Sequence, residues 1–351
     1  MRKAFTFLFC FMILLYGWHG YNFIVNQELS FNQSKGELSD IAEEVIAIPL
    51  ETHNNCQLEQ IQLIKRDKEH IFLISNQQLF HFNSSGKFIG QITTLSNQTS
   101  KGIDVIDYVI DPVHACLIVI GEEKKVHYYD YDGQLLAQRT LPQELSWQTF
   151  GQIAYHDHHL WVTINQTKKN HNQDAIMEQW LYKFDLNFRE VEKRKLEAAD
   201  LGRININYCP NLEIKTFNGN VYVYTSAFQQ AHILNDTLYL INSNQLTITN
   251  ECRTILPIQI GKRFLITSYC NPIATELNYT FCYDQRQEKA YQIKNGLDDN
   301  FFMTGKISKL QPLDLNGQTY YYLKKGEEVY QSFPHIQTEN NPVLFIIKMK
   351  A

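Results

Sequence analysis

The sequence has no large excess of either charge. Its 351 residues include 32 Lys and Arg and 37 Asp and Glu, for a formal net charge of −5 at pH 7. Nucleic acids are bound through broad cationic surfaces, so we expect no nucleic-acid partner. Only 20% of the residues are charged, whereas 44% are hydrophobic and 13% aromatic. A chain of this composition buries enough apolar surface to fold, which excludes an intrinsically disordered protein.

The familiar catalytic and metal-binding motifs are also missing. No GxSxG, HExxH, Walker or GxGxxG pattern occurs, and the cysteines form neither CxxC nor another zinc-ligand spacing. We therefore expect no cofactor, and no positive evidence favours catalysis. Removal of Cys10 with an N-terminal signal would leave six cysteines, an even number that permits several disulfide pairings. We expect most of them to be small buried residues on strands.

The N-terminus carries a targeting signal. Met1–Lys3 is basic, and Ala4–Trp18 (AFTFLFCFMILLYGW) is an almost unbroken apolar run. This order is typical of a secretory signal peptide. The run is shorter than the roughly 20 residues that span a bilayer, although Tyr21–Val25 extends it. We predict that residues 1–20 are a signal peptide or a membrane anchor, followed by a linker over residues 21–40.

The sequence is compatible with both a cleaved signal peptide and an uncleaved membrane anchor. Leu15–Gly17 and Trp18–Gly20 each offer one small residue where signal cleavage prefers two. Cys10 lies inside the apolar run rather than after it, so we do not expect a lipoprotein. The predicted localisation is export to the periplasm or cell envelope, with membrane attachment through the N-terminal segment as an alternative to release.

The rest of the chain is predicted to consist of repeated short strands. Runs of five to eight β-branched, aromatic and aliphatic residues alternate with Asn, Asp, Gly and Ser, which predicts an all-β fold. His70–Ile92 and Ala115–Leu141 share one pattern, in which an Asn or Asp and a Gly form the turn before the last strand. The two turn glycines, Gly86 and Gly133, lie 47 residues apart. A third copy has Asp185 at the acidic position and Phe188 in place of the glycine.

A four-stranded unit that recurs every 40 to 55 residues is typical of a β-propeller. The 311 residues from Ile41 to Ala351 suffice for about six such units. The last unit lacks an outer strand, and Glu44–Leu50 (EVIAIPL) has no unit of its own. We therefore predict that residues 41–351 form a six-bladed β-propeller, in which this N-terminal strand completes the last blade and closes the ring.

Five segments in order resemble the bacterial six-bladed β-propeller envelope proteins. They are Ile46–Thr52, Leu79–Ile92, Asn235–Tyr239, Gly296–Asp299 and Asn340–Leu344. The resemblance covers nearly the whole exported chain and implies an NHL-like propeller, an exported location and no assigned activity. The sequence departs from that family in lacking a lipobox. It also has residues 94–111 where the family carries a Gly-Pro-rich segment.

Two groups of side chains are candidates for a functional site. His156 and His158 of the sequence HDHH would project to the same face of a strand, as zinc or copper ligands do. They fall where the repeat requires a hairpin turn, however, and we expect solvated histidines beside a turn aspartate. Asp298 and Asp299 could bind a ligand or metal, or act as a paired acid and base. Because they follow Gly296, a turn or capping role is the alternative.

Two functions follow from these features. The first is a non-catalytic binding or scaffold propeller of the bacterial cell envelope, which presents one face to a protein, peptide or glycan. The alternative is a metal-dependent hydrolase or lyase with its site at the central channel. An enzyme requires several free carboxylates or imidazoles on the innermost strands, whereas a binding protein does not.

Overall fold

The computed structural model describes residues 36–92, 103–121, 125–142, 145, 150–169, 175–200, 212–217, 220–225, 253–260, 263–270, 278–287, 289–313, 318–336 and 340–351. Nearly all its regular structure is β-strand, so the predicted all-β class is confirmed. The strands are β1 (Ala42–Pro49), β2 (Ile61–Asp67), β3 (His70–Ser75), β4 (Gln78–Asn83), β5 (Phe88–Gln91), β6 (Val105–Asp111), β7 (Cys116–Gly121), β8 (Lys125–Asp130), β9 (Leu135–Thr140), β10 (Phe150–His156), β11 (His159–Lys169), β12 (Ala175–Phe184), β13 (Glu190–Asp200), β14 (Leu212–Phe217), β15 (Asn220–Thr225), β16 (Arg253–Ile260), β17 (Phe264–Cys270), β18 (Asn278–Asp284), β19 (Lys289–Lys294), β20 (Leu297–Asp299), β21 (Gly305–Ile307), β22 (Gln311–Pro312), β23 (Thr319–Lys324) and β24 (Val343–Met349). Two short helices are α2 (Leu38–Ile41) and α4 (Glu327–Tyr330).

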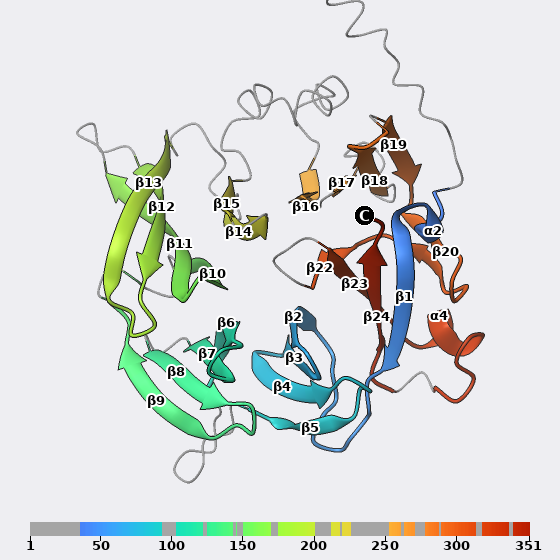
Figure 1. Ribbon diagram of the computed structural model, residues 1–351, viewed down its shortest axis with the longest axis horizontal. Coiled ribbons are helices and arrows are strands. Elements are labelled where there is room, and N and C mark those ends of the chain that lie inside the picture. The colour runs from blue at the N-terminus through green and yellow to red at the C-terminus, as the bar shows by residue number, and fades with distance from the viewer. Residues whose placement is uncertain are drawn as a thin grey trace, which may run out of the picture.

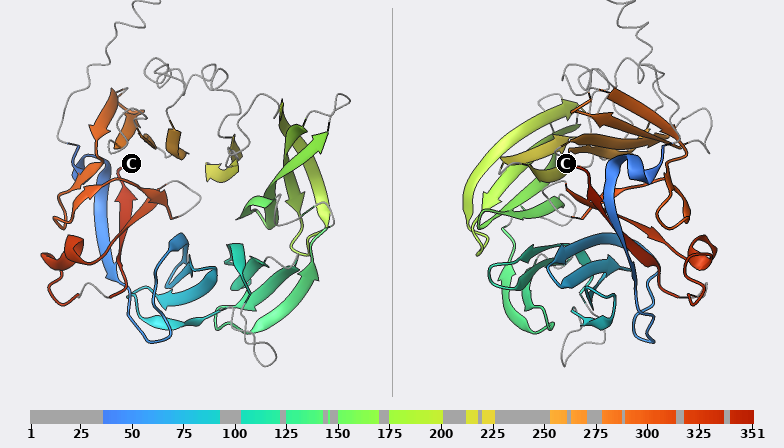
Figure 2. Two further views of the ribbon diagram at one scale, coloured as in Figure 1. Left: turned by 180° about the vertical axis from the view of Figure 1, so that it is seen from behind. Right: turned by 45° about the vertical axis from the view of Figure 1, so that its right-hand side comes forward.

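The described strands form antiparallel sheets that follow one another around a common axis (Figure 1). Four-stranded sheets contain β2–β5, β6–β9, β10–β13 and β16–β19, and a fifth has the order β1-β24-β23-β22. β14 pairs with β15, and β20 pairs with β21. In each larger sheet one edge strand lies nearest the axis, as β2, β6, β10 and β22 do in Figure 1. The same arrangement is seen from behind in Figure 2.

The turn that recurs before the last strand of a sheet has one geometry in three copies. The Asn83 side chain accepts the N–H of Ser85 and Lys87, and the N–H of Gly86 is 3.0 Å from the Asn83 carbonyl. Asp130 accepts the N–H of Gln134 in the second copy, and Asp185 accepts the N–H of Asn187 and Arg189 in the third. The third turn residue has a positive φ in each copy: 84° at Gly86, 85° at Gly133 and 59° at Phe188. The predicted equivalence of these turns is confirmed.

The N-terminal strand joins the last sheet. β1 pairs antiparallel with β24 from Ala42 opposite Met349 to Pro49 opposite Val343. The predicted pairing of Glu44–Leu50 with the end of the chain is therefore confirmed. In this sheet β22 lies nearest the axis and β1 is the outermost strand (Figure 1). The two ends of the chain are thus held by one hydrogen-bonded ladder.

The hydrophobic core is divided among the spaces between consecutive sheets. One cluster joins the sheet of β1 to that of β2–β5, a second joins β2–β5 to β6–β9, and a third joins β6–β9 to β10–β13. A fourth lies between β16–β19 and the last sheet, where it includes fully buried Leu38 of α2. Because each sheet buries its faces only against its neighbours, stability depends on the complete stack.

The described cysteines belong to this core. Cys56, Cys116 and Cys282 are free and buried, as expected for small residues of a strand-rich core. Burial raises the pKa of the Cys56 and Cys116 thiols to about 11. Cys10, Cys209 and Cys252 lie outside the described residues, and the side chain of Cys270 is not described.

Candidate functional site

The HDHH segment forms the hairpin between β10 and β11. His156 ends β10 opposite His159 of β11, and Asp157 and His158 are the two turn residues. Both turn residues have positive φ, 49° and 58°, as a tight two-residue turn requires. The predicted turn is therefore confirmed. The Nδ1 of His159 lies 2.6 Å from the Asp157 carbonyl oxygen, and the exposed His158 lies near the Tyr155 hydroxyl.

Asp298 and Asp299 are neighbours with different environments. The Asp298 carboxylate is half exposed and forms an ion pair with Lys306 at 2.7 Å. The Asp299 carboxylate is buried and accepts the N–H of Phe301 and Phe302 at 3.1 and 3.0 Å. It also accepts hydrogen bonds from the Thr304 hydroxyl and, at 2.9 Å, from the Tyr322 hydroxyl. These contacts fix the turn after β20 and connect it to Tyr322 on β23.

Polar side chains on the inner strands connect consecutive sheets. The Nζ of Lys65 on β2 lies 3.3 Å from the Asp107 carboxylate on β6 and also donates to the Tyr108 carbonyl. The other oxygen of Asp107 accepts the Ile153 N–H of β10 at 3.0 Å. On β10, the Gln152 side chain accepts the N–H of Ile214 on β14. We call Lys65, Asp107 and Gln152 the inner-strand belt. Burial lowers the pKa of Lys65, and the adjacent Asp107 opposes this change.

A second cluster lies where the first two sheets meet. The Nδ1 of His70 is 2.8 Å from the Nε2 of His81. The Tyr131 ring packs against both imidazoles, and its hydroxyl donates to the Asp67 carboxylate at 2.7 Å. Burial lowers the pKa of His81 to about 4, with a further contribution from the nearby His70. Burial and the hydrogen-bonded Asp67 raise the pKa of Tyr131 well above its usual range.

A third cluster lies where the second and third sheets meet. The Asp111 carboxylate is buried, and one of its oxygens lies 2.7 Å from the Nδ1 of His114. Its other oxygen accepts the backbone N–H of Val113 and His114. The His114 side chain is 62% exposed, so the rest of its ring is open to solvent. Burial and the Asp111 charge raise the pKa of Tyr155 to about 12.

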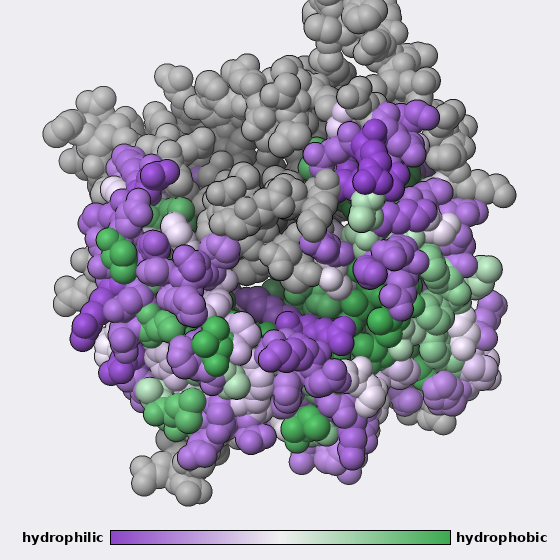
Figure 3. Space-filling view, in the orientation of Figure 1, coloured by the Kyte–Doolittle hydropathy of each residue, from purple (hydrophilic) through white to green (hydrophobic). Residues whose placement is uncertain are grey.

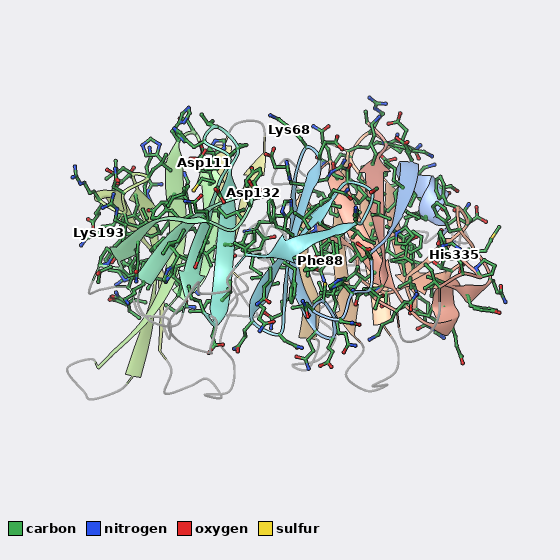
Figure 4. The ribbon with its side chains drawn as sticks, turned by 90° about the horizontal axis from the view of Figure 1, so that it is seen from below. Lys68, Phe88, Asp111, Asp132, Lys193 and His335 are labelled. Atoms are coloured by element: carbon green, nitrogen blue, oxygen red, sulfur yellow. The ribbon has the colours of Figure 1, made fainter. Side chains whose placement is uncertain are left out.

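These two clusters belong to one side of the ring. They are built by the turns that follow β2, β6 and β10 and by the β8–β9 turn, and Figure 4 places Lys68 and Asp111 at its upper side. We call the set the histidine–tyrosine face; its members are Asp67, His70, His81, Asp111, His114, Tyr131, Tyr155 and His158. Of this set, only His158 was a candidate from the sequence, because the other members come together from separate repeats. A search for histidines at the turn after the first strand of each repeat would have found His70 and His114.

Within the described part of the chain, no three His, Cys, Asp or Glu side chains are grouped so as to hold a metal ion. The structure does not bring His156 and His158 together with Asp298 and Asp299: the first pair lies in the third sheet and the second pair follows β19. None of the helices in the described ranges is long and apolar enough to cross a membrane.

Comparison with known proteins identifies a sequence family and a solved structure with a similar fold. The sequence pattern of a domain of unknown function, DUF4934, matches residues 23–256, more than half of the chain. A crystal structure of a "putative exported protein" from Bacteroides fragilis matches with a TM-score of 0.59 at 16% identity, over 90% of this chain and 98% of that one.

The extracellular domain of BT4673 from B. thetaiotaomicron matches with a TM-score of 0.43 at 13% identity. That match covers 86% of this chain and 40% of the longer one. No curated protein has significant sequence similarity to the chain.

Proposed function

The chain belongs to the DUF4934 family, a domain of unknown function, and on that premise we propose that it is a non-catalytic binding or scaffold protein of the bacterial cell envelope. We propose further that it is a six-bladed, NHL-like β-propeller. Five described four-stranded sheets in a ring, with the β14–β15 pair between the third and the β16–β19 sheets, support this count. The basic and apolar N-terminal segments support export.

The proposal rests on the hydrogen bonds and ion pairs that the carboxylates of the inner strands already form. Asp67, Asp107 and Asp111 lie on β2 and β6, where an axial active site would need free acids or bases. Each is already engaged: Asp67 by Tyr131, Asp107 by Lys65 and two backbone N–H groups, and Asp111 by its own turn. In the described inner strands these groups hold neighbouring sheets and turns together, which favours a scaffold over a hydrolase or lyase.

The histidine–tyrosine face is the proposed binding surface. It combines solvent-facing imidazole at His114 and His158 with the Tyr155 hydroxyl. Oriented donors, acceptors and amphipathic rings on a rigid scaffold suit a peptide, protein or glycan ligand. The hydrogen bond of His114 to buried Asp111 fixes the orientation of its ring, which reduces the entropy lost on binding.

The test compares two double variants on glycan and peptide arrays. His114→Ala with His158→Ala removes the imidazoles of the face, and Val191→Ala with Lys193→Ala changes exposed residues of outer strand β13. We expect the first pair to abolish array binding and the second to leave it unchanged. The same proteins are assayed with chromogenic ester, phosphate and glycoside substrates in the presence of Zn²⁺, Mn²⁺ or Ca²⁺. Metal-dependent turnover that survives repurification would overturn the proposal in favour of the enzyme.

N-terminal sequencing of protein from the envelope fraction tests the location. A start near residues 18–22 indicates a cleaved signal peptide, and an intact Met1 in the membrane fraction indicates an anchor. Recovery in the cytoplasm contradicts an envelope protein.

A further inference from the structure

The turn after β20 displays two large apolar side chains. Asp299 fixes this turn through the N–H groups of Phe301 and Phe302 and the Thr304 hydroxyl. Phe301 is 39% exposed and Met303 is 69% exposed. Met303 also has a φ of 56°, a left-handed conformation that non-glycine residues adopt only at a cost in free energy. The rigid turn therefore holds apolar groups in water rather than burying them.

A second exposed ring lies on the segment that packs against this turn. Tyr330, at the end of α4, is 58% exposed. The Ser332 hydroxyl donates to the Phe302 carbonyl, and the Phe302 and Phe333 rings stack with centroids 5.8 Å apart. These contacts hold the two segments together above the partly buried Phe302 and Phe333 rings, and we call Phe301, Met303 and Tyr330 the apolar knob. In Figure 3 hydrophobic residues gather over the part of the ring that carries β1, β24 and α4.

The knob lies beside the point where the chain leads to its N-terminal apolar run. The Asp298 N–H donates to the Gly36 carbonyl at 2.8 Å, and Glu37 forms a parallel bridge with Asp298. The Asn300 side chain accepts the Ser39 N–H and donates to the Ser39 hydroxyl and the Glu37 carboxylate. The residue before Phe301 is thus tied to the first described residues of the chain.

From this arrangement we infer that the apolar knob inserts into the surface of a lipid bilayer in which the segment Ala4–Trp18 is anchored. Seventeen residues separate Trp18 from Gly36, at most about 60 Å of extended chain, so the anchor limits how far Gly36, beside the knob, can lie from the membrane. The anchor itself is short for a bilayer span, and a second apolar contact strengthens such an attachment. Phe, Met and Tyr side chains suit the water–lipid boundary.

The charges near the knob favour apolar insertion over attraction to anionic lipid. Lys306 is paired with Asp298 at 2.7 Å, and Lys324 with Glu328 at 2.6 Å. Both lysines are therefore neutralised by a neighbouring carboxylate, and the attachment of the knob is expected to be insensitive to salt. Figure 4 places His335, which follows α4, at the outer edge of the ring. The knob thus occupies a different part of the molecule from the histidine–tyrosine face. The inference rests on the proposed envelope location with an uncleaved anchor, whereas loss of ligand binding at the histidine–tyrosine face would leave it standing.

The experiment places a photoreactive benzoylphenylalanine at Met303 or at Val113 in the full chain. Val113 is 61% exposed but lies in the β6–β7 turn, which makes it a matched exposed apolar control. Each protein is reconstituted with Met1 retained in vesicles of phosphatidylethanolamine and phosphatidylglycerol and then irradiated. We expect lipid adducts at position 303 to exceed those at position 113 several-fold, at low salt and at about 1 M salt alike.

Equal lipid labelling at the two positions would overturn the inference. Adducts at position 303 that join two copies of the protein would indicate a self-association surface and would also overturn it. Adducts that vanish at high salt would show an electrostatic contact and contradict apolar insertion. As a second variant, Phe301→Asp with Tyr330→Asp should reduce the labelling at position 303 while leaving the unfolding temperature nearly unchanged, because both side chains are exposed.

Discussion

The Nδ1 of His70 lies 2.8 Å from the Nε2 of His81 across the β3–β4 ladder, and the Phe72 ring stacks on His81. Protonation of His81 is disfavoured by the burial of its ring and by the adjacent His70. Burial accordingly lowers the pKa of His81 to about 4. In an unfolded chain the same group has a pKa of about 6.5.

This pair predicts a loss of stability in mild acid. Above pH 6.5 His81 is neutral in the folded and unfolded states, so its protonation does not change the free energy of unfolding. Between pH 6.5 and 4 the unfolded state binds a proton at His81 that the folded state does not bind. The free energy of unfolding should therefore fall as the pH drops through this window. His81→Phe, measured by urea unfolding from pH 7.5 to 4.5, should show a smaller fall, and His335→Gln should match the wild type. An equal slope in His81→Phe would contradict the assignment.

The pairing of β1 with β24 predicts a sharp difference between Ile46 and Ile48. Ile48 is 4% exposed in the core against the first sheet, whereas Ile46 on the same strand is 44% exposed. Ile48→Asp buries an unpaired charge and should lower the free energy of unfolding by about 3–5 kcal/mol or prevent folding. Ile46→Asp should change it by less than about 1 kcal/mol. Similar unfolding curves for both would show that β1 does not close the ring in solution.

The inner-strand belt predicts that substitutions at Lys65 and Asp107 have strongly coupled effects on the free energy of unfolding. Asp107→Asn leaves the buried ammonium without its carboxylate and should cost about 3–5 kcal/mol. Lys65→Met in the same protein removes that ammonium and should restore part of the loss. Chemical denaturation of the two single variants and the double variant measures the coupling energy. Strictly additive effects would show that the pair does not interact across the two sheets.

The neighbouring carboxylates after Gly296 offer a matched comparison. Asp299→Ala leaves buried donors of the turn and of Tyr322 without an acceptor and should cost about 3 kcal/mol or more. Asp298→Ala removes only a half-exposed ion pair and should change stability by less than about 1 kcal/mol. Thermal unfolding of both variants decides the matter. If Asp298→Ala instead abolishes binding of a ligand that Asp299 variants retain, Asp298 has the predicted ligand-binding role.

The hairpin histidines should be dispensable for folding and should not retain metal. His156→Ala with His158→Ala is expected to change stability by less than about 0.5 kcal/mol, because His156 directly precedes a tight turn and the exposed His158 lies in it. Elemental analysis of protein purified without chelators should find substoichiometric Zn, Ca, Mn and Cu. One equivalent of metal in the wild type that disappears in the double variant would establish the metal site.

Local patterns in the sequence specified the strands, the repeated turns and the closing strand. Asn83, Asp130 and Asp185 act through hydrogen bonds to residues two to four positions away, so their role is visible in a short window. The apolar run Glu44–Leu50, which has no four-stranded unit of its own, likewise marked β1 as a strand that needed a partner. In the described structure, β24 of the last sheet is that partner.

The candidate sites required the tertiary structure. Lys65 meets Asp107, and Asp107 meets Ile153, across separations of 42 and 46 residues, and no local signal pairs a charge on one repeat with a backbone group on the next. Burial also decided the chemistry: His81 resembles any strand histidine in sequence, yet its enclosure by Phe72, Tyr131 and His70 lowers its pKa. Periodicity is a property of neighbouring residues, whereas desolvation and charge pairing depend on which repeats the stack brings together.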